Sequence, residues 1–175
     1  LRMSRGLGDV YKRQQDMLPN KFEPKKKNRW IFALEGIDSF LIKTAARPSI
    51  SIESQPISYM NSKRFVAGLA SFETLSLTLH DPIAPSGSQQ VMEWVRTHFE
   101  SVSGRAGYAD FYKRDCQLKL VDPVGTVIEL WDIKGAFLTS AGFGDVSYED
   151  GGMMEVALTL QFDNCVLQYL SLIHI

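Results

Sequence analysis

Residues 71–81, SFETLSLTLHD, alternate apolar and polar side chains with a period of two. The side chains on one side are Leu75, Leu77 and Leu79, and those on the other are Thr74, Ser76, Thr78 and His80. This period is typical of a β-strand with one buried face and one solvated face. The solvated face is unusual because it holds small neutral groups instead of the usual lysines and glutamates.

The same pattern returns in residues 154–163, MEVALTLQFD. The side chains predicted to face the core are Met154, Val156, Leu158, Leu160 and Phe162, and those predicted to face away are Glu155, Ala157, Thr159, Gln161 and Asp163. Two such strands in one short chain predict a half-buried antiparallel sheet. If copies of the chain closed into a ring, strands of this kind could line an aqueous channel, since closure removes exposed sheet edges.

Several other stretches have strand character. Residues 29–35 are apolar on both faces, and we expect residues 39–46 to form their partner strand, ended by Arg47 and Pro48. Residues 49–54 alternate until Pro56 interrupts them. Residues 114–122 and 125–133 flank a predicted type I turn, in which proline stands second and glycine fourth. Residues 134–152 are predicted to be a glycine-broken connection with a short strand near Val146.

One helix is predicted over residues 88–102. Its apolar stripe follows helical spacing through Val91, Trp94, Val95, His98, Phe99 and Val102. Ser86 or Ser88 provides the N-cap, and Gly104 is the expected C-terminal stop. The predicted fold class is therefore mainly β with one α-helix, an antiparallel β-barrel or sandwich.

The two ends of the chain are expected to be foreign to the domain. One DNA encoding of DVYKRQ, residues 9–14, is the reverse complement of an encoding of LSLIHI, residues 170–175. We therefore interpret residues 1–14 and 170–175 as translated sequencing adapter. Residues 15–28 are predicted to be a flexible arm, and residues 29–169 to form a single domain. The Lys25–Lys27 run of the arm is expected to be solvated, and contact with an acidic surface of a partner is the alternative.

Composition excludes several functions. The full chain has 19 Lys and Arg against 20 Asp and Glu, and without the first fourteen residues the balance becomes 15 against 19. This mild acidity argues against tight binding to the nucleic-acid backbone. No apolar run approaches the roughly 20 residues of a membrane span. Two cysteines are too few for a disulfide framework, which favours a reducing compartment.

The sequence offers no recognisable catalytic, cofactor-binding or metal site. His98 is expected to be a core or interface histidine, and Cys116 a buried thiol. His80 has no serine or cysteine nucleophile and no second histidine at ligand spacing. The glycines do not form a phosphate-binding loop between a strand and a helix. We therefore predict that the protein is not an enzyme and takes no cofactor.

Residues 29–169 resemble the tail tube protein of contractile-tailed bacteriophages. The resemblance is carried, in order, by the first strand pair ending in ARP, PISYMNSKRFVAGLASFETLSLTLHD, VMEWVRTHF, CQLKLVDPVGTVIELWDIKGAF, FGDVSYED and EVALTLQFDN. It implies a β-barrel or sandwich with one helix, in which four strands of each subunit join a continuous inner barrel. It further implies hexameric rings that stack into the tube of a virion tail, assembled in the cytoplasm of the bacterial host.

The resemblance also implies partners. They are other copies of the chain, the tail sheath protein, and baseplate and tail-terminator proteins. Genomic DNA would pass through the lumen without specific binding, and no membrane is involved. A neutral or acidic wall suits this role because it does not hold phosphate. We predict that Glu155, Thr159, Gln161 and Asp163 lie on or near the lumen.

The stretch YMNSKRFVAG, residues 59–68, is too long and too apolar for an ordinary hairpin connection. By resemblance it corresponds to the segment that contacts the next ring. The expected contact residues are Met60, Asn61, Lys63, Arg64, Phe65 and Val66. Lys63 and Arg64 would meet an acidic patch on the neighbour, and Phe65 and Val66 would fill an apolar notch. A loop or β-bulge used only within the chain remains the alternative.

Three other assignments remain open at this point. The chain could be the tube subunit of a type VI secretion or pyocin-like machine. It could be a tube-like baseplate or terminator protein that caps the tube. It could also be an enzyme or ligand-binding β-domain.

Overall fold

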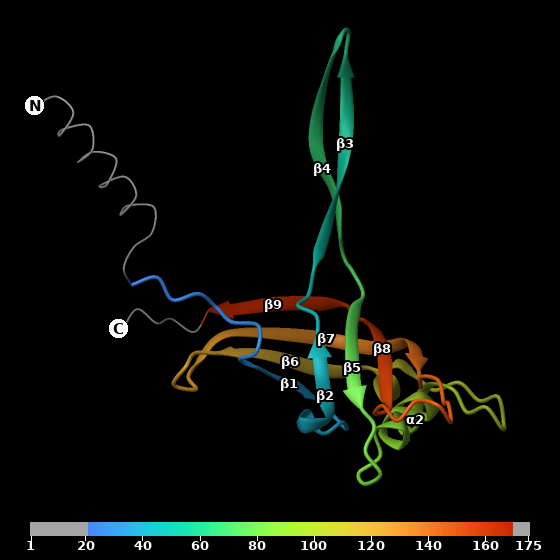
Figure 1. Ribbon diagram of the computed structural model, residues 1–175. Coiled ribbons are helices and arrows are strands. Elements are labelled where there is room, and N and C mark those ends of the chain that lie inside the picture. The colour runs from blue at the N-terminus through green and yellow to red at the C-terminus, as the bar shows by residue number, and fades with distance from the viewer. Residues whose placement is uncertain (1–20, 170–175) are drawn as a thin grey trace, which may run out of the picture.

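The computed structural model describes residues 21–169 (Figure 1). The predicted adapter segments and residues 15–20 of the predicted arm lie outside the described residues. The strands are β1 Trp30–Leu34, β2 Ile42–Ala45, β3 Ile50–Tyr59, β4 Ser62–Phe72, β5 Leu75–His80, β6 Arg114–Val121, β7 Val127–Gly142, β8 Glu155–Gln161 and β9 Asn164–Tyr169. The helical elements are the 3-10 turn η1 Ser39–Leu41, the helix α2 Gly87–His98 and the single turn α3 Ala109–Tyr112.

Strand β7 joins two antiparallel layers. Its first half lies between β6 and β9, and β1 extends that layer beyond β6. Its second half pairs with β8, followed by β5 and then β2. At the crossover Gly135 has a φ of +70°, a conformation that favours glycine. The layers face each other as a sandwich, so the predicted fold class is confirmed, although the sheet of one chain does not close into a barrel.

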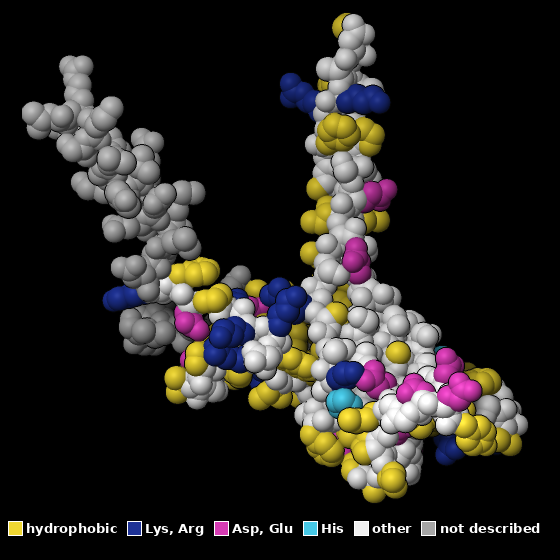
Figure 2. Space-filling view, viewed as in Figure 1, with side chains coloured by type: hydrophobic (Ala, Val, Ile, Leu, Met, Phe, Trp, Pro, Cys, Tyr) yellow, Lys and Arg dark blue, Asp and Glu magenta, His cyan; other side chains and the backbone are white. Residues whose placement is uncertain are grey.

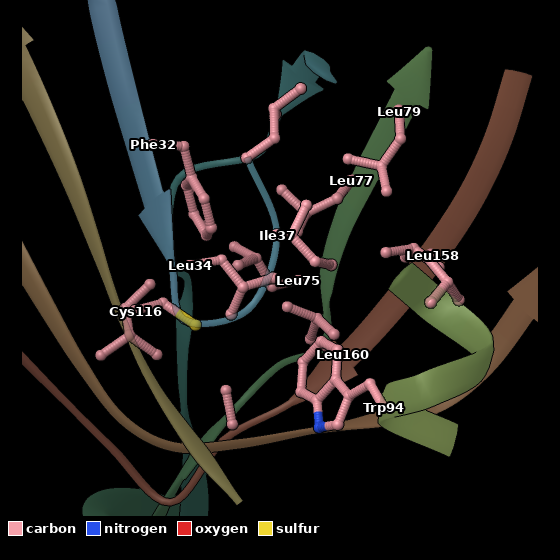
Figure 3. Packing of buried hydrophobic residues seen from close by; sticks show 14 of the residues in the cluster. Phe32, Leu34, Ile37, Leu75, Leu77, Leu79, Trp94, Cys116, Leu158 and Leu160 are labelled. Atoms are coloured by element: carbon pink, nitrogen blue, oxygen red, sulfur yellow. The ribbon is translucent and has the colours of Figure 1, made fainter. Parts of the chain in front are cut away.

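The core lies between the two layers (Figure 3). The alternation in β5 and β8 is confirmed, since every leucine of β5 is buried and so are Val156, Leu158 and Leu160 of β8. From the opposite layer, Phe32, Leu34, Cys116 and Leu118 pack against them. Met154 was predicted to face the core, but it lies just before β8 and is half-exposed. One face of each layer is thereby buried, and the other remains free.

Helix α2 covers one end of the sandwich (Figure 1). Ser86 is the N-cap, as predicted, and its Oγ accepts a hydrogen bond from the Gln89 amide at 3.4 Å. Trp94 is buried, and its Nε1 donates to the Tyr112 carbonyl at 2.7 Å. The helix ends at His98 rather than at 102, because Phe99 leaves it to bridge Ala106 in an antiparallel pair.

The predicted stripe is therefore too long. Phe99 and Val102 are exposed, and so is His98, which stacks edge-on against Tyr112 and is not a core histidine.

Three predictions about strands were wrong. Residues 29–35 do not pair with 39–46, because β1 pairs with β6 while β2 pairs with β5. The predicted glycine-broken connection is strand as far as Gly142, since Gly135 forms a local irregularity and does not end β7. No strand forms near Val146, which is exposed, and β9 was not predicted. The first error arose because strands that follow each other in the sequence were assumed to pair, whereas β1 and β2 each pair with a strand further along the chain.

Candidate assembly surfaces

The most conspicuous feature is the ribbon of β3 and β4, which projects from the body of the protein (Figure 1). Tyr59 opposes Ser62 across a two-residue turn, and Met60 has a φ of 44° there. Pro56 was predicted to interrupt this region, but it lies within β3 opposite Phe65. A proline is tolerated because both strands of an isolated ribbon are edges. The stretch 59–68 is thus the tip and returning strand of a hairpin, not a connecting loop.

The ribbon exposes apolar side chains that its own chain does not cover. Phe65 is 67% exposed and Leu69 is 81% exposed. Six more large apolar residues of the ribbon and its tip are also exposed, namely Ile50, Ile52, Ile57, Tyr59, Met60 and Val66. Solvated apolar surface of this extent, combined with two unpaired edges, is typical of a surface that another chain covers.

The register divides the predicted contact residues between two faces. Successive residues of a strand point to opposite sides. Lys63 and Phe65 therefore share one face, whereas Arg64 and Val66 share the other. Figure 2 shows basic side chains on both sides of the ribbon near its tip. A single notch cannot receive both Phe65 and Val66, so each face offers its own pair of one basic and one apolar side chain.

A second candidate surface is the outer face of the layer formed by β2, β5, β8 and the end of β7. Cross-strand register aligns two rows of small side chains on it. The first row is Thr44, Thr78, Ala157 and Gly142, and the second is Ser76, Thr159 and Ser140. The sequence neighbours of the β5 and β8 members of these rows are buried, which places those members on the face opposite the core. The residues of β2 and β7 join the same rows through their cross-strand pairing.

The four predicted lumen residues lie along β8 and just beyond it. Thr159 is in the second row of the polar face. Gln161 is half-buried, and its Nε2 donates to the Phe72 carbonyl at 3.2 Å. Glu155 forms an ion pair with Lys43, and Asp163 forms one with Lys113 at 2.7 Å.

Both carboxylates are thus neutralised locally. The hydrogen bond that Lys113 donates to Asp163 raises the pKa of Lys113. The outer face is therefore closer to neutral than the sequence indicated.

The segment before β1 is tied to the sheet by a buried carboxylate. Glu129 is only 4% exposed, and it accepts hydrogen bonds from Lys25 Nζ and Trp131 Nε1. Arg47 lies 4.0 Å away. Burial raises the pKa of Glu129, but the hydrogen bonds from Lys25 and Trp131 outweigh it and leave that pKa lowered. Lys25 is therefore not merely a solvated flank, and no local sequence signal indicated this partner.

Lys25 of this ion pair also lines a cavity of about 590 Å³. The apolar side chains of the cavity come from β1 and β6, and the basic ones from residues 25–27 and from β2 and its end. The residues lining it are Lys25, Lys26, Lys27, Asn28, Trp30, Lys43, Thr44, Ala45, Arg47, Leu118 and Leu120. Sequence reasoning did not find this cavity, because its walls are far apart along the chain.

Within residues 21–169 no group of His, Cys, Asp and Glu has the arrangement of a metal site. In the same range no helix is long and apolar enough to cross a bilayer. Cys116 is buried as predicted, and burial raises the pKa of its thiol to about 12. Such a thiol is inert as a nucleophile near neutral pH.

Comparison with known proteins shows likeness in fold. No family model and no curated protein sequence matches the chain. The tube-terminating cap of the anti-feeding prophage matches 85% of this chain and 93% of its own, with a TM-score of 0.70 and 17% identity. The match to a chain of the PVC sheath-tube complex, from an extracellular contractile injection system, covers 90% of this chain and 97% of the other, with a TM-score of 0.67 and 16% identity. The match to the SPP1 tail tube covers 83% of this chain and 80% of the tail tube chain, with a TM-score of 0.51 and 10% identity.

Each of these structures is a tube, a cap or a sheath-tube complex. The chain therefore has the tube-type fold of contractile injection systems and phage tails that its sequence resemblance implies.

Proposed function

We propose that the chain is a subunit of hexameric rings that stack into the inner tube of a contractile phage tail and give a conduit for DNA. The observation that carries this proposal is the polar outer face of a four-stranded layer from which an uncovered ribbon projects. Such a layer has two free edges, β2 and the second half of β7. Closure of six copies would pair these edges and turn the small neutral side chains inward.

The strand directions support closure. Strands β2, β5, β8 and β7 are antiparallel in succession. A neighbouring β2 beside the end of β7 would therefore continue the same alternation. The layer would become part of a barrel around a lumen, as the resemblance implies, and each ring would present six ribbons to the next ring.

The wall chemistry supports a conduit. Small hydroxyl groups remain hydrated without attracting phosphate, and the ion pairs of Glu155 and Asp163 cancel charge near this face. DNA would then pass without binding, since its affinity for proteins depends mainly on Lys and Arg. Thr159, Glu155, Gln161 and Asp163 are our candidates for residues at the lumen, and sheath, baseplate and terminator proteins are the proposed partners.

A second candidate is the tube subunit or terminator of an extracellular contractile injection system. The structural likeness is greater to the anti-feeding prophage cap and the PVC complex than to the SPP1 tail tube. A terminator would form a single ring and would not polymerise, whereas a tube subunit would stack without limit.

Light scattering and negative-stain electron microscopy of the purified chain test both candidates. Annular particles of six copies that stack into hollow tubes support a tube subunit, and rings that never stack support a terminator. A monomer at all accessible concentrations would contradict both. Recovery of assembled tails together with a sheath protein and encapsidated DNA would distinguish a phage from an injection system.

A further inference from the structure

We propose that the acidic loop of residues 143–154 of one copy docks into the basic cavity beside β2 of the next copy in the ring. This inference rests on the proposed ring and specifies the contact that would close it. Such an interface is heterologous, because two different surfaces of the same chain meet and rotation closes the ring.

The loop leaves one free edge of the four-stranded layer, and the cavity borders the other. Residues 143–154 directly follow β7, whose last part pairs with β8 alone. The cavity is lined by residues of β2, the strand at the opposite edge. Figure 1 shows this order of strands across the layer, from β2 through β5 to β8. Edge-to-edge closure would therefore bring the loop of one copy to the cavity of its neighbour.

The loop leaves the layer at the end where β2, the strand that lines the cavity, begins. Ile42, at the start of β2, opposes Leu79, and the adjacent His80 opposes Glu155, at the start of β8. Gly142, at the end of β7, opposes Ala157 in the same strand. The loop thus leaves β7 at the end of the layer where β2 begins, and the cavity begins there at Lys43 and extends along β2 toward Arg47.

The charges are complementary. Lys26 and Lys27 at the cavity make no ion pair within residues 21–169, and nor do the loop acids, which are Asp145, Glu149 and Asp150. In Figure 2 basic side chains gather on one side of the base of the ribbon, and acidic ones gather on the other. Opposite charges on the two flanks of one chain favour association in one direction around a ring and disfavour the reverse contact.

The apolar parts are complementary as well. Tyr148 is fully exposed in the loop and makes no contact that would explain an aromatic ring there. The cavity has an apolar wall formed by Trp30, Leu118 and Leu120. An aromatic side chain that enters a pocket with charged groups around it is the usual form of an interface anchor. We assign Tyr148 as the anchor and the loop acids as the groups that meet the lysines.

Crosslinking of the full chain tests the contact directly. A carbodiimide joins carboxylates to lysines that touch, and a mixture of ¹⁵N-labelled and unlabelled chains separates contacts between copies from those within one copy. We expect mixed-isotope crosslinks from Lys26 or Lys27 to Asp145, Glu149 or Asp150. Rings whose lysines crosslink only to other carboxylates, or to none, would overturn the proposal.

Charge reversal provides the second test. Lys26→Glu with Lys27→Glu, or Asp145→Lys with Asp150→Lys, should each weaken ring assembly by about tenfold or more. The two reversals combined should restore it to within about threefold, because opposite charges then face each other again. The matched controls Lys21→Glu and Asp110→Lys change exposed charges that lie outside the cavity and the loop, and should have little effect.

Tyr148→Ser separates the anchor from the charges and, because the side chain is exposed, should leave folding intact. Ring assembly that is unaffected by this variant and by both reversals would refute the docking contact while the ring itself stands. A wild-type chain that never forms rings would refute both the docking contact and the proposed function.

Discussion

Removing the side chains of Phe65 and Lys63 should weaken the stacking of rings without unfolding the chain. Both residues lie on the same face of the projecting ribbon. In the isolated chain Phe65 is 67% exposed, so Phe65→Ala with Lys63→Ala should change the free energy of unfolding by no more than about 1 kcal/mol. The ribbon does not depend on this face for its own fold.

The cost to stacking follows from the surface that a neighbour would cover. Full burial of a phenylalanine stabilises by about 1.5–3 kcal/mol, so the two thirds still exposed here would contribute about 1–2 kcal/mol on assembly. An exposed ion pair between Lys63 and a carboxylate of the neighbouring ring would add about 0.2–1 kcal/mol to the stacking energy. Six ribbons act together between two rings, so Phe65 alone would account for about 6–12 kcal/mol per ring-to-ring contact, if the six act independently.

The measurement compares two quantities for the same double variant. Urea unfolding of dilute chain reports folding, and sedimentation with electron microscopy reports tube length. Val124→Ala is a suitable control, because Val124 is an even more exposed apolar residue in a turn away from the ribbon. We expect normal unfolding, intact rings and few or no tubes. A loss of more than about 1 kcal/mol in unfolding free energy, or tubes of normal length, would refute the assignment of this face to stacking.

Three further predictions concern the core, the buried ion pair and the proposed wall. Leu77→Ala removes a buried side chain between the two layers and should cost about 2–5 kcal/mol in urea unfolding. The pKa of Glu129 is lower in the folded chain than in the unfolded chain, where it is about 4.3. The ionised carboxylate therefore stabilises the fold above that pH, and this stabilisation is lost as the pH falls through the pKa of the folded state. Glu129→Gln should therefore be less stable at neutral pH, with a smaller further loss in acid, as pH-dependent unfolding would reveal. Thr78→Lys with Thr159→Lys should make assembled tubes retain DNA in filter-binding assays, with a steep salt dependence that wild-type tubes lack.

The sequence was most informative where a pattern is local. The alternation of β5 and β8 predicted their buried and polar faces, because a strand with one covered face must alternate. The N-cap at Ser86 and the turn between β6 and β7 were also predicted correctly. In that turn the Gly125 amide donates to the Asp122 carbonyl at 3.1 Å, as its proline and glycine positions required.

The sequence was least informative where distant segments meet. Whether β1 pairs with β2 or with β6 depends on how much apolar surface the whole sandwich buries. The residues of β1 do not by themselves indicate which strand is its partner. Gly135 could equally have ended a strand or, as found, allowed one strand to cross between layers. The pairing of Lys25 with Glu129 spans 104 residues, and the basic cavity that it borders was invisible for the same reason.

The ribbon is mechanically continuous with the layer beneath it. The Ala46 amide donates to the Ser76 carbonyl at 3.0 Å, and the Glu73 amide donates to the Ser49 carbonyl at 3.1 Å, so the ladder of β2 and β5 runs on into β3 and β4 with little interruption. Because β3 and β4 are joined at the tip, a force applied there along the ribbon would pass through both strands and load the main-chain hydrogen bonds between β5 and β8 in shear. Because these bonds lie perpendicular to the strands, they share such a load and do not break one after another, as they would on peeling. A ribbon held in this way could transmit an axial thrust into the body of the subunit without being pulled out of it.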